Sequence, residues 1–449
     1  MQGHAGSELA EIMYIATAPA LLLLICQLLC YSKNTRKIKF DYIAIQYFIF
    51  VFPLLLQLMG PPSPRAILTS AALLAALFSL FNLQLLRKER SKVPLLALRQ
   101  ALSAHRGSVM LITCISILAV DFHAFPRRFA KAETYGVSLM DAGVGSIIAA
   151  SAFAAGMKDA AGSEYAGTRS SQQGRRTKRD VVRLAALAGL GLGRALVTAA
   201  LDYQNHVSEY GIHWNFFMTL AAVRGLTLFL PRVVAGSHLT SGILGVGVLA
   251  AHQGLLSLGG VKELVHTDAR DSHSFISANK EGIFSLPGYF ALHLLGCACG
   301  AVLEETAGPS SQLRAGQRRR VAALVAALWT VFFAVSRAVE PVSRRSCNAA
   351  YVLWMLALNA QSLALLAAVA AALPGQPLPR LLQAVNDSML PVFLVANVLT
   401  GGVNLVMDTM AVGGWGARGV VGGYMGLVVV AAVVFQRLGG NGRQDKWKR

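Results

Sequence analysis

The sequence predicts an all-α protein, a polytopic transmembrane helical bundle. Of its 449 residues, 55% are hydrophobic and only 14% are charged, whereas a soluble domain has about 25% charged residues. The apolar residues form blocks of roughly 17–25 residues, the length that a helix needs to cross the ~30 Å hydrocarbon core of a bilayer. The blocks do not alternate in polarity as barrel strands do, and only helices and closed barrels satisfy the backbone in lipid.

We expect about thirteen spans in a single transmembrane domain that includes residues 1–449. The first block has acidic residues on its flank, Glu8 and Glu11, and no clear small-residue cleavage site. It is therefore interpreted as a retained span and not as a signal peptide. In rounded limits the expected spans are 10–31, 42–60, 66–86, 107–122, 137–157, 184–201, 212–231, 239–257, 287–303, 321–336, 347–373, 388–407 and 419–436.

The distribution of basic residues predicts the orientation of the bundle. One set of alternate connections, together with the C-terminal tail, contains about 28 Lys and Arg residues, whereas the other set contains about 11. The positive-inside rule places the first set in the cytosol, so that the N-terminus is lumenal and the C-terminus is cytosolic. We therefore expect a mobile cytosolic loop at 159–182, a lumenal loop at 258–286 and a basic cytosolic tail at 437–449.

The net charge of +19 does not indicate a nucleic-acid-binding protein, because the basic residues lie in short runs between apolar blocks. Such runs are typical of topology signals and of contacts with anionic lipid. Five of the six cysteines fall inside apolar blocks, and neither a disulfide framework nor a zinc-site spacing is visible. We expect no metal and no tightly bound cofactor.

Charged residues are densest at 120–146, where Asp121 ends an apolar span and Lys131 follows ten positions later, beyond a proline-containing turn. The two side chains can therefore meet. A desolvated aspartate suits a general base for a hydroxyl, and a nearby cation can stabilise an oxyanion. Arg127 and Arg128 are candidates for gripping a phosphate. The alternative is that the three cations anchor the helix at the lipid headgroups, with Asp121 as their counter-ion.

A second polar cluster lies at 202–219, on the same expected side of the membrane. His206 and His213 can act as base and acid or donate hydrogen bonds to sugar hydroxyls. They are seven positions apart without a third ligand, so a metal site is not expected. The alternative is an aromatic anchor at the membrane interface. Further candidates for substrate binding in and around these two clusters are Glu133, Asp141, Glu209, Trp214 and Asn215.

Several polar residues elsewhere are candidates for pairing or for binding. Lys280 is a further candidate for substrate binding, and it can also pair with Glu281. Asn397 and Asn404 lie seven positions apart, on one helix face, where they can bond across helices or line a polar cavity.

Two arginines, Arg194 and Arg224, fall inside expected spans, where a charge needs a partner. We expect each to form a structural ion pair with Asp141 or Asp202.

A stretch of about 26 residues from Asp121 to Ser146 resembles the signature of the glycosylphosphatidylinositol (GPI) inositol-acyltransferase family. It has the sequence D-F-x-x-F-P-R-R-F-A-K-x-E-x-Y-G-x-S-L-M-D-x-G-V-G-S. This family includes the fungal GPI-anchored wall transfer proteins and the animal phosphatidylinositol-glycan class W proteins. The resemblance continues, in the family's order, through 202–217, 279–289, 344–354 and 396–408.

The resemblance implies an enzyme of the endoplasmic reticulum membrane. Such an enzyme transfers a fatty acyl group, typically palmitoyl, from acyl-CoA to the inositol 2-hydroxyl of glucosaminyl-phosphatidylinositol. It also implies that Asp121 and Lys131, both intact here, are the catalytic pair. No serine or cysteine stands out as a nucleophile, so we expect direct transfer without an acyl-enzyme.

Three other functions remain open at this point. A polytopic transporter of a lipid or small polar substrate would use intramembrane Arg, Asp and Asn, but the sequence shows no internal repeat. An acyltransferase of the membrane-bound O-acyltransferase kind would need a histidine within the bundle. His252 and His293 lie in apolar segments, but without a matching context. The third is a non-catalytic scaffold.

Overall fold

The computed structural model describes residues 6–31, 42–60, 97–163, 169–200, 207–230, 237–271, 273–307, 315–373 and 376–444. Within these ranges the regular structure is helical, and strand-like pairing is limited to two isolated bridges from Gly6 and Ser7 to Val137. The helices are α1 (Leu9–Tyr31), α2 (Tyr42–Met59), α4 (Ala97–Ala119), the 3-10 helix η2 (Arg127–Phe129), α5 (Leu139–Ser163), α6 (Arg169–Ala200), α7 (Val207–Tyr210), α8 (Phe216–Phe229), α10 (His238–Leu258), α11 (Val261–His266), α12 (Phe275–Ala278), α13 (Lys280–Phe284), α14 (Leu286–Ala307), α15 (Ala315–Ala338), α16 (Ala349–Ala372), α17 (Arg380–Asp387), α18 (Met389–Val406) and α19 (Gly414–Gln444).

The protein is an all-α polytopic membrane protein, as the sequence predicts. In the described part of the chain, nine helical segments are long and apolar enough to cross a membrane, and α2 and α8 contain shorter apolar helices at two further expected spans. The expected span at 66–86 lies outside the described residues. The number of thirteen spans and the orientation of the bundle stay predictions.

Two of the expected loops contain helices. Residues 159–163 and 169–182 belong to α5 and α6, while 164–168 lie outside the described ranges. The segment expected as a mobile cytosolic loop thus contains helix, and its mobility and its side of the membrane stay predictions. Lys, Arg and Gln are strong helix formers, so a helix can continue after its sequence turns polar. The connection at 258–286 likewise contains α11, α12 and α13.

The centre of the bundle is α16, which contacts α1, α4, α5, α14 and α15. Most of its side chains are buried, including Tyr351 and Trp354, which have no exposed surface. A helix that is apolar on all sides is expected to be surrounded by other helices, and α16 follows this rule.

Glycines allow α5 and α14 to approach closely. A Cβ atom on Gly156 of α5 would lie 1.9 Å from the carbonyl oxygen of Cys297, and one on Gly300 of α14 would lie 2.4 Å from that of Phe153. Gly296 and Gly300 form a small-xxx-small pattern, which is typical of helix contacts in lipid, where tight packing replaces the hydrophobic effect. This contact holds the C-terminal half of α5 against α14.

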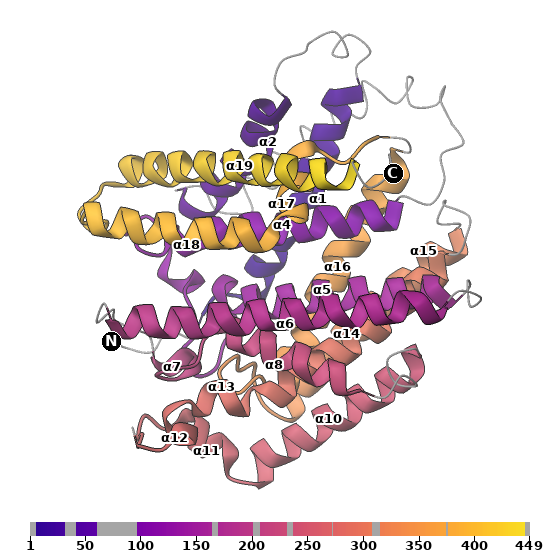
Figure 1. The fold of residues 1–449 in the computed structure, drawn as a ribbon, viewed down its shortest axis with the longest axis vertical. Coiled ribbons are helices and arrows are strands. Elements are labelled where there is room, and N and C mark those ends of the chain that lie inside the picture. Colours follow the sequence, from indigo (N-terminus) through magenta and orange to yellow (C-terminus); the bar gives the residue numbers. More distant parts are fainter. Residues whose placement is uncertain are drawn as a thin grey trace.

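One end of the bundle, called the polar end here, is formed by residues 120–138, 207–215, 259–271, 273–285 and 339–348. Backbone hydrogen bonds join these segments, from Gly136 N–H to the Val342 carbonyl (2.9 Å) and from Ile212 N–H to the Ala278 carbonyl (2.9 Å). The short helices α7, α11, α12 and α13 gather on one side of the molecule, at the lower left of Figure 1. The polar clusters found in the sequence therefore come together in space.

Candidate active site

Three aromatic side chains fix the connection between α4 and α5. Phe122, Phe125 and Phe129 have no exposed surface, and the rings of the last two lie 5.8 Å apart, edge to face. The phenylalanines are spaced three and four positions apart, so each turn of this segment directs one ring into the core. The charged residues of this segment, among them Asp121 directly before the first phenylalanine and Lys131 after the last, are therefore well anchored.

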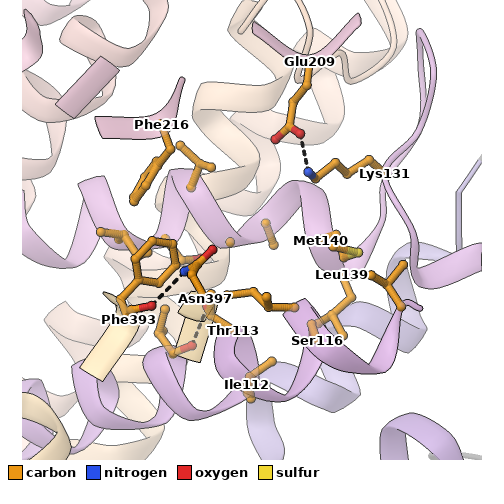
Figure 2. A pocket seen from close by; sticks show the side chains of 18 of the residues that line it. Ile112, Thr113, Ser116, Lys131, Leu139, Met140, Glu209, Phe216, Phe393 and Asn397 are labelled. Atoms are coloured by element: carbon orange, nitrogen blue, oxygen red, sulfur yellow. Dashed lines mark hydrogen bonds and ion pairs between the residues drawn. The ribbon is translucent and has the colours of Figure 1, made fainter. Parts of the chain in front are cut away.

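A cavity of about 350 Å³ opens among α1, α4, α5, α16 and α18, with residues 209–216 forming a further wall. Its charged lining residues are Lys131, Arg194 and Glu209, and most of the remaining wall is apolar. Figure 2 shows Lys131 and Glu209 facing each other, well apart from Phe216 and Phe393 on another wall. A cavity with a charged part and an apolar remainder suits a molecule with a polar head and a hydrocarbon tail.

Lys131 forms an ion pair and hydrogen bond with Glu209. The guanidinium of Arg344 lies 3.6 Å from the same carboxylate. Burial acts to raise the pKa of Glu209, but the charges of Lys131 and Arg344 and the hydrogen bond outweigh it and lower the pKa to about 2. A carboxylate with this pKa is a weak base, so Glu209 suits the orientation of Lys131 better than proton abstraction.

Asp141 and Arg344 form a second, fully buried pair. The Arg344 Nε–H donates to the Asp141 carboxylate at 2.8 Å, and the aspartate has no exposed surface. Ser138 Oγ and the backbone N–H of Ala132 also donate to this carboxylate, at 2.7 and 3.0 Å, so its acceptors are well satisfied. Together with the Lys131–Glu209 pair, these groups form a chain of alternating charge from the cavity to the start of α5.

Asp121 is not itself among the described residues that line the cavity, but it directly follows Val120, which lines it. Its carboxylate accepts a 2.9 Å hydrogen bond from the side-chain amide of Asn404. The sequence suggested that Asp121 can meet Lys131, but the carboxylate paired with Lys131 is that of Glu209. The two asparagines of α18 were expected either to bond across helices or to line a cavity. Asn404 does the first and Asn397 does the second.

Arg127, Arg128 and Glu133 are not among the described residues that line the cavity. Arg128 makes two hydrogen bonds to Glu11 of α1, at 2.8 and 2.9 Å. Arg127 donates to the Val120 carbonyl at 2.8 Å, and Glu133 is exposed. The two arginines thus fasten the motif to the bundle, and phosphate binding by them stays a prediction.

Asn279 holds the segment that carries the second cluster. Its side-chain oxygen accepts hydrogen bonds from the backbone N–H groups of His213 and Trp214, at 2.8 and 2.9 Å. Asn215 caps α8 and donates to the Gly191 carbonyl at 2.8 Å. His213, Trp214 and Asn215 all line the cavity, whereas His206 lies outside the described residues.

Comparison with known proteins identifies the family of this chain. The model of the GWT1 family matches residues 1–435. The chain belongs to the GWT1 family. It is similar to proteins named GPI-anchored wall transfer protein 1 from Yarrowia lipolytica (36% identical, over 69% of this chain and 66% of that one) and Gibberella zeae (32% identical, over 90% of each). It is also 39% identical to an uncharacterized protein of Arabidopsis thaliana, over 70% of this chain and 68% of that one.

In this GWT1-family chain, Lys280 lies away from the described cavity. It has no exposed surface and donates to the backbone carbonyls of Thr267 and Ala269, at 2.7 and 2.9 Å. Its expected pairing with Glu281 was wrong, because Glu281 binds Arg270 and Arg345 instead. Adjacent residues of a helix do not face each other, which is the physical reason.

The structure also corrects the expected partner of Arg224, whereas Asp202, one of the two partners expected for Arg194 and Arg224, lies outside the described residues. Arg224 pairs with Asp180. The cation that pairs with Asp141 is Arg344, a residue that the sequence did not single out as part of the site. One signal was available, since Arg344 and Arg345 are adjacent in a connection on the side expected to be poor in basic residues. The next turn contains Cys347 with φ +48°, a left-handed conformation that non-glycine residues rarely adopt and that often marks functional sites.

Proposed function

We propose that the protein transfers a fatty acyl group, typically palmitoyl, from acyl-CoA to the inositol 2-hydroxyl of glucosaminyl-phosphatidylinositol in the endoplasmic reticulum membrane. Membership of the GWT1 family, with relatives named GPI-anchored wall transfer protein, supports an acyltransferase role in GPI-anchor biosynthesis. The observation that carries the proposal is the cavity, which combines the charges of Lys131, Arg194 and Glu209 with a largely apolar wall. Both substrates combine a polar part with hydrocarbon chains.

The proposed reaction is direct acyl transfer. Asp121 accepts the proton of the inositol hydroxyl, whose oxygen attacks the carbonyl carbon of the thioester. Lys131 stabilises the negative charge that develops on the carbonyl oxygen. As the new C–O ester bond forms, the C–S bond breaks, and the CoA thiolate leaves and takes up a proton. Glu209 orients Lys131 through their ion pair.

The first experiment incubates membranes containing the protein with glucosaminyl-phosphatidylinositol and radiolabelled palmitoyl-CoA. The lipids are then separated by thin-layer chromatography. We expect a more hydrophobic labelled lipid that resists phosphatidylinositol-specific phospholipase C, because an acylated 2-hydroxyl cannot take part in that cleavage. No labelled product from a folded, membrane-inserted protein would overturn the proposed function.

The roles of the catalytic pair are tested with Asp121→Ala and Lys131→Ala. Each variant should lose acylation while the protein still accumulates. The matched control is Glu304→Ala, because the Glu304 carboxylate also has a polar partner, Arg99. It lies near the C-terminal end of α14, whereas the N-terminal end of α14 adjoins the polar end. Acylation by Asp121→Ala at the wild-type rate would remove the base assignment.

Transport of a lipid or small polar substrate, the alternative from the sequence, is not favoured. Family membership points to GPI-anchor biosynthesis. The charged pairs Lys131–Glu209 and Asp141–Arg344 lie together at the polar end, as expected if their residues belong to a single reaction centre.

A further inference from the structure

One face of α4 runs along the described cavity. His105, Ser108 and Ser116 line it, separated by three and eight positions. At a rise of 1.5 Å per residue, the interval from Ser116 to His105 corresponds to about 16 Å along the helix. The cavity therefore has an extended stripe of uncharged polar groups, separate from the charged residues Lys131 and Glu209.

The two serine hydroxyls are buried without a protein partner. Ser108 and Ser116 are 3% and 5% exposed, and neither Oγ atom has a hydrogen-bond partner among the described residues. Thr113, on the same helix, is different because its hydroxyl donates to the Val109 carbonyl at 2.7 Å (Figure 2). A serine in a helix can likewise donate to the carbonyl four residues earlier, and burying a hydroxyl without a hydrogen-bond partner costs free energy. The two serines thus have hydrogen-bonding capacity available for a molecule in the cavity.

His105 adds an acceptor at the far end of the stripe. The amide nitrogen of Asn359 donates to Ser146 Oγ and to the Met355 carbonyl, at 3.1 and 2.7 Å. The amide oxygen of Asn359 therefore faces His105 Nε2, at 3.0 Å, and this network assigns the ring proton to Nε2. The other ring nitrogen, Nδ1, is then an acceptor suited to an amide N–H.

Uncharged groups spaced along a line suit a slender chain that carries polar groups at intervals. The pantetheine arm of acyl-CoA has this form, because its thioester and two amides follow one another along a chain. A glycolipid acceptor differs, since its sugar and phosphate are gathered in one headgroup, which suits Lys131, Arg194 and Glu209. We propose that His105, Ser108 and Ser116 bind the pantetheine arm of the acyl donor along α4. This proposal rests on the proposed function, because it takes acyl-CoA as the donor.

The test measures KM for each substrate separately in the variant Ser108→Ala/Ser116→Ala, and in His105→Ala. We expect KM for palmitoyl-CoA to rise about 10-fold in the double variant, with KM for glucosaminyl-phosphatidylinositol unchanged. The matched control is Ser103→Ala, which also removes a hydroxyl from α4, but one that does not line the cavity and already donates to the Arg99 carbonyl at 3.0 Å. It should leave both KM values at the wild-type level.

A truncated donor gives a second readout. The palmitoyl thioester of N-acetylcysteamine keeps the thioester and one amide but lacks the rest of the arm. For this donor the KM values of wild type and Ser108→Ala should differ less than they do for palmitoyl-CoA. The reason is that the truncated donor lacks the part of the arm that Ser108 is proposed to contact. Because KM is measured only on active protein, misfolding of the variant cannot produce this difference between the two donors.

The outcomes separate the two proposals. Acylation by wild type, combined with serine variants that change only the acceptor's KM or neither KM, would overturn the pantetheine site and leave the proposed function standing. A folded wild-type protein that does not acylate the lipid would overturn both.

Discussion

The side-chain amide of Asn404, in the last turn of α18, donates a 2.9 Å hydrogen bond to the carboxylate of Asp121, directly after α4. The two residues are 283 positions apart in the sequence. This contact fixes one oxygen of the carboxylate that we propose as the general base. It also stabilises the ionised form of that carboxylate, because a hydrogen bond to a charged acceptor is stronger than one to a neutral acceptor.

Replacing this donor should slow the reaction. Asn404→Leu keeps a similar volume but removes the hydrogen bond, and we expect acylation to fall roughly 10- to 150-fold, since a hydrogen bond to a charged group is worth about 1.5–3 kcal/mol. Leu405→Ala, at an exposed neighbouring position, is the control. Acylation by Asn404→Leu at the wild-type rate would argue against a role for this contact in the reaction.

The Lys131–Glu209 pair predicts a pH-dependent stability. The pKa of Glu209 is lowered from its ordinary 4.5 to about 2 in the folded protein, which corresponds to about 3 kcal/mol. This contribution is fully present above pH 4.5 and is lost as the pH falls from there to about 2. Thermal unfolding of the detergent-solubilised protein should therefore show a smaller loss of Tm over this interval for Glu209→Gln than for wild type. Parallel pH curves would contradict the assignment.

Asp141 and Arg344 should behave as a coupled pair in stability measurements. Because both are buried, Asp141→Asn or Arg344→Gln alone leaves an uncompensated charge and should destabilise the protein by about 3–5 kcal/mol. The double variant removes both charges and should lose less than the sum of the two single changes. Denaturation midpoints of all four proteins complete the cycle, and additive losses would show that the pair is not coupled.

The close contact of α5 and α14 can be tested with one methyl group. Gly300→Ala places a Cβ atom 2.4 Å from the Phe153 carbonyl oxygen, so the helices must move apart. We expect a destabilisation of about 1–3 kcal/mol, measured as a lower Tm. Gly247→Ala, on α10, is the matched control because a Cβ atom there meets nothing within 4 Å. Equal Tm values for the two variants would contradict this description of the contact.

The sequence predicted the bundle well because span length and apolar composition are local properties. It also identified the segments that form the polar end, since alternate connections between spans lie on one side of a membrane. It did not identify Arg344 as the partner of Asp141, because that pairing depends on how α5 packs beside α16. Polarity alone likewise did not reveal that α6 is helical from Arg169 onwards.

The buried pair also has a consequence for how the protein is made. Asp141 and Arg344 are separated by 203 positions, so the ribosome needs roughly 10–40 s to reach the arginine after it has passed the aspartate, at ~5–20 residues per second. During that time α5 carries a carboxylate that has not yet met its cation. A chaperone or the insertion machinery that shelters α5 in this interval would therefore influence how much enzyme reaches its mature form.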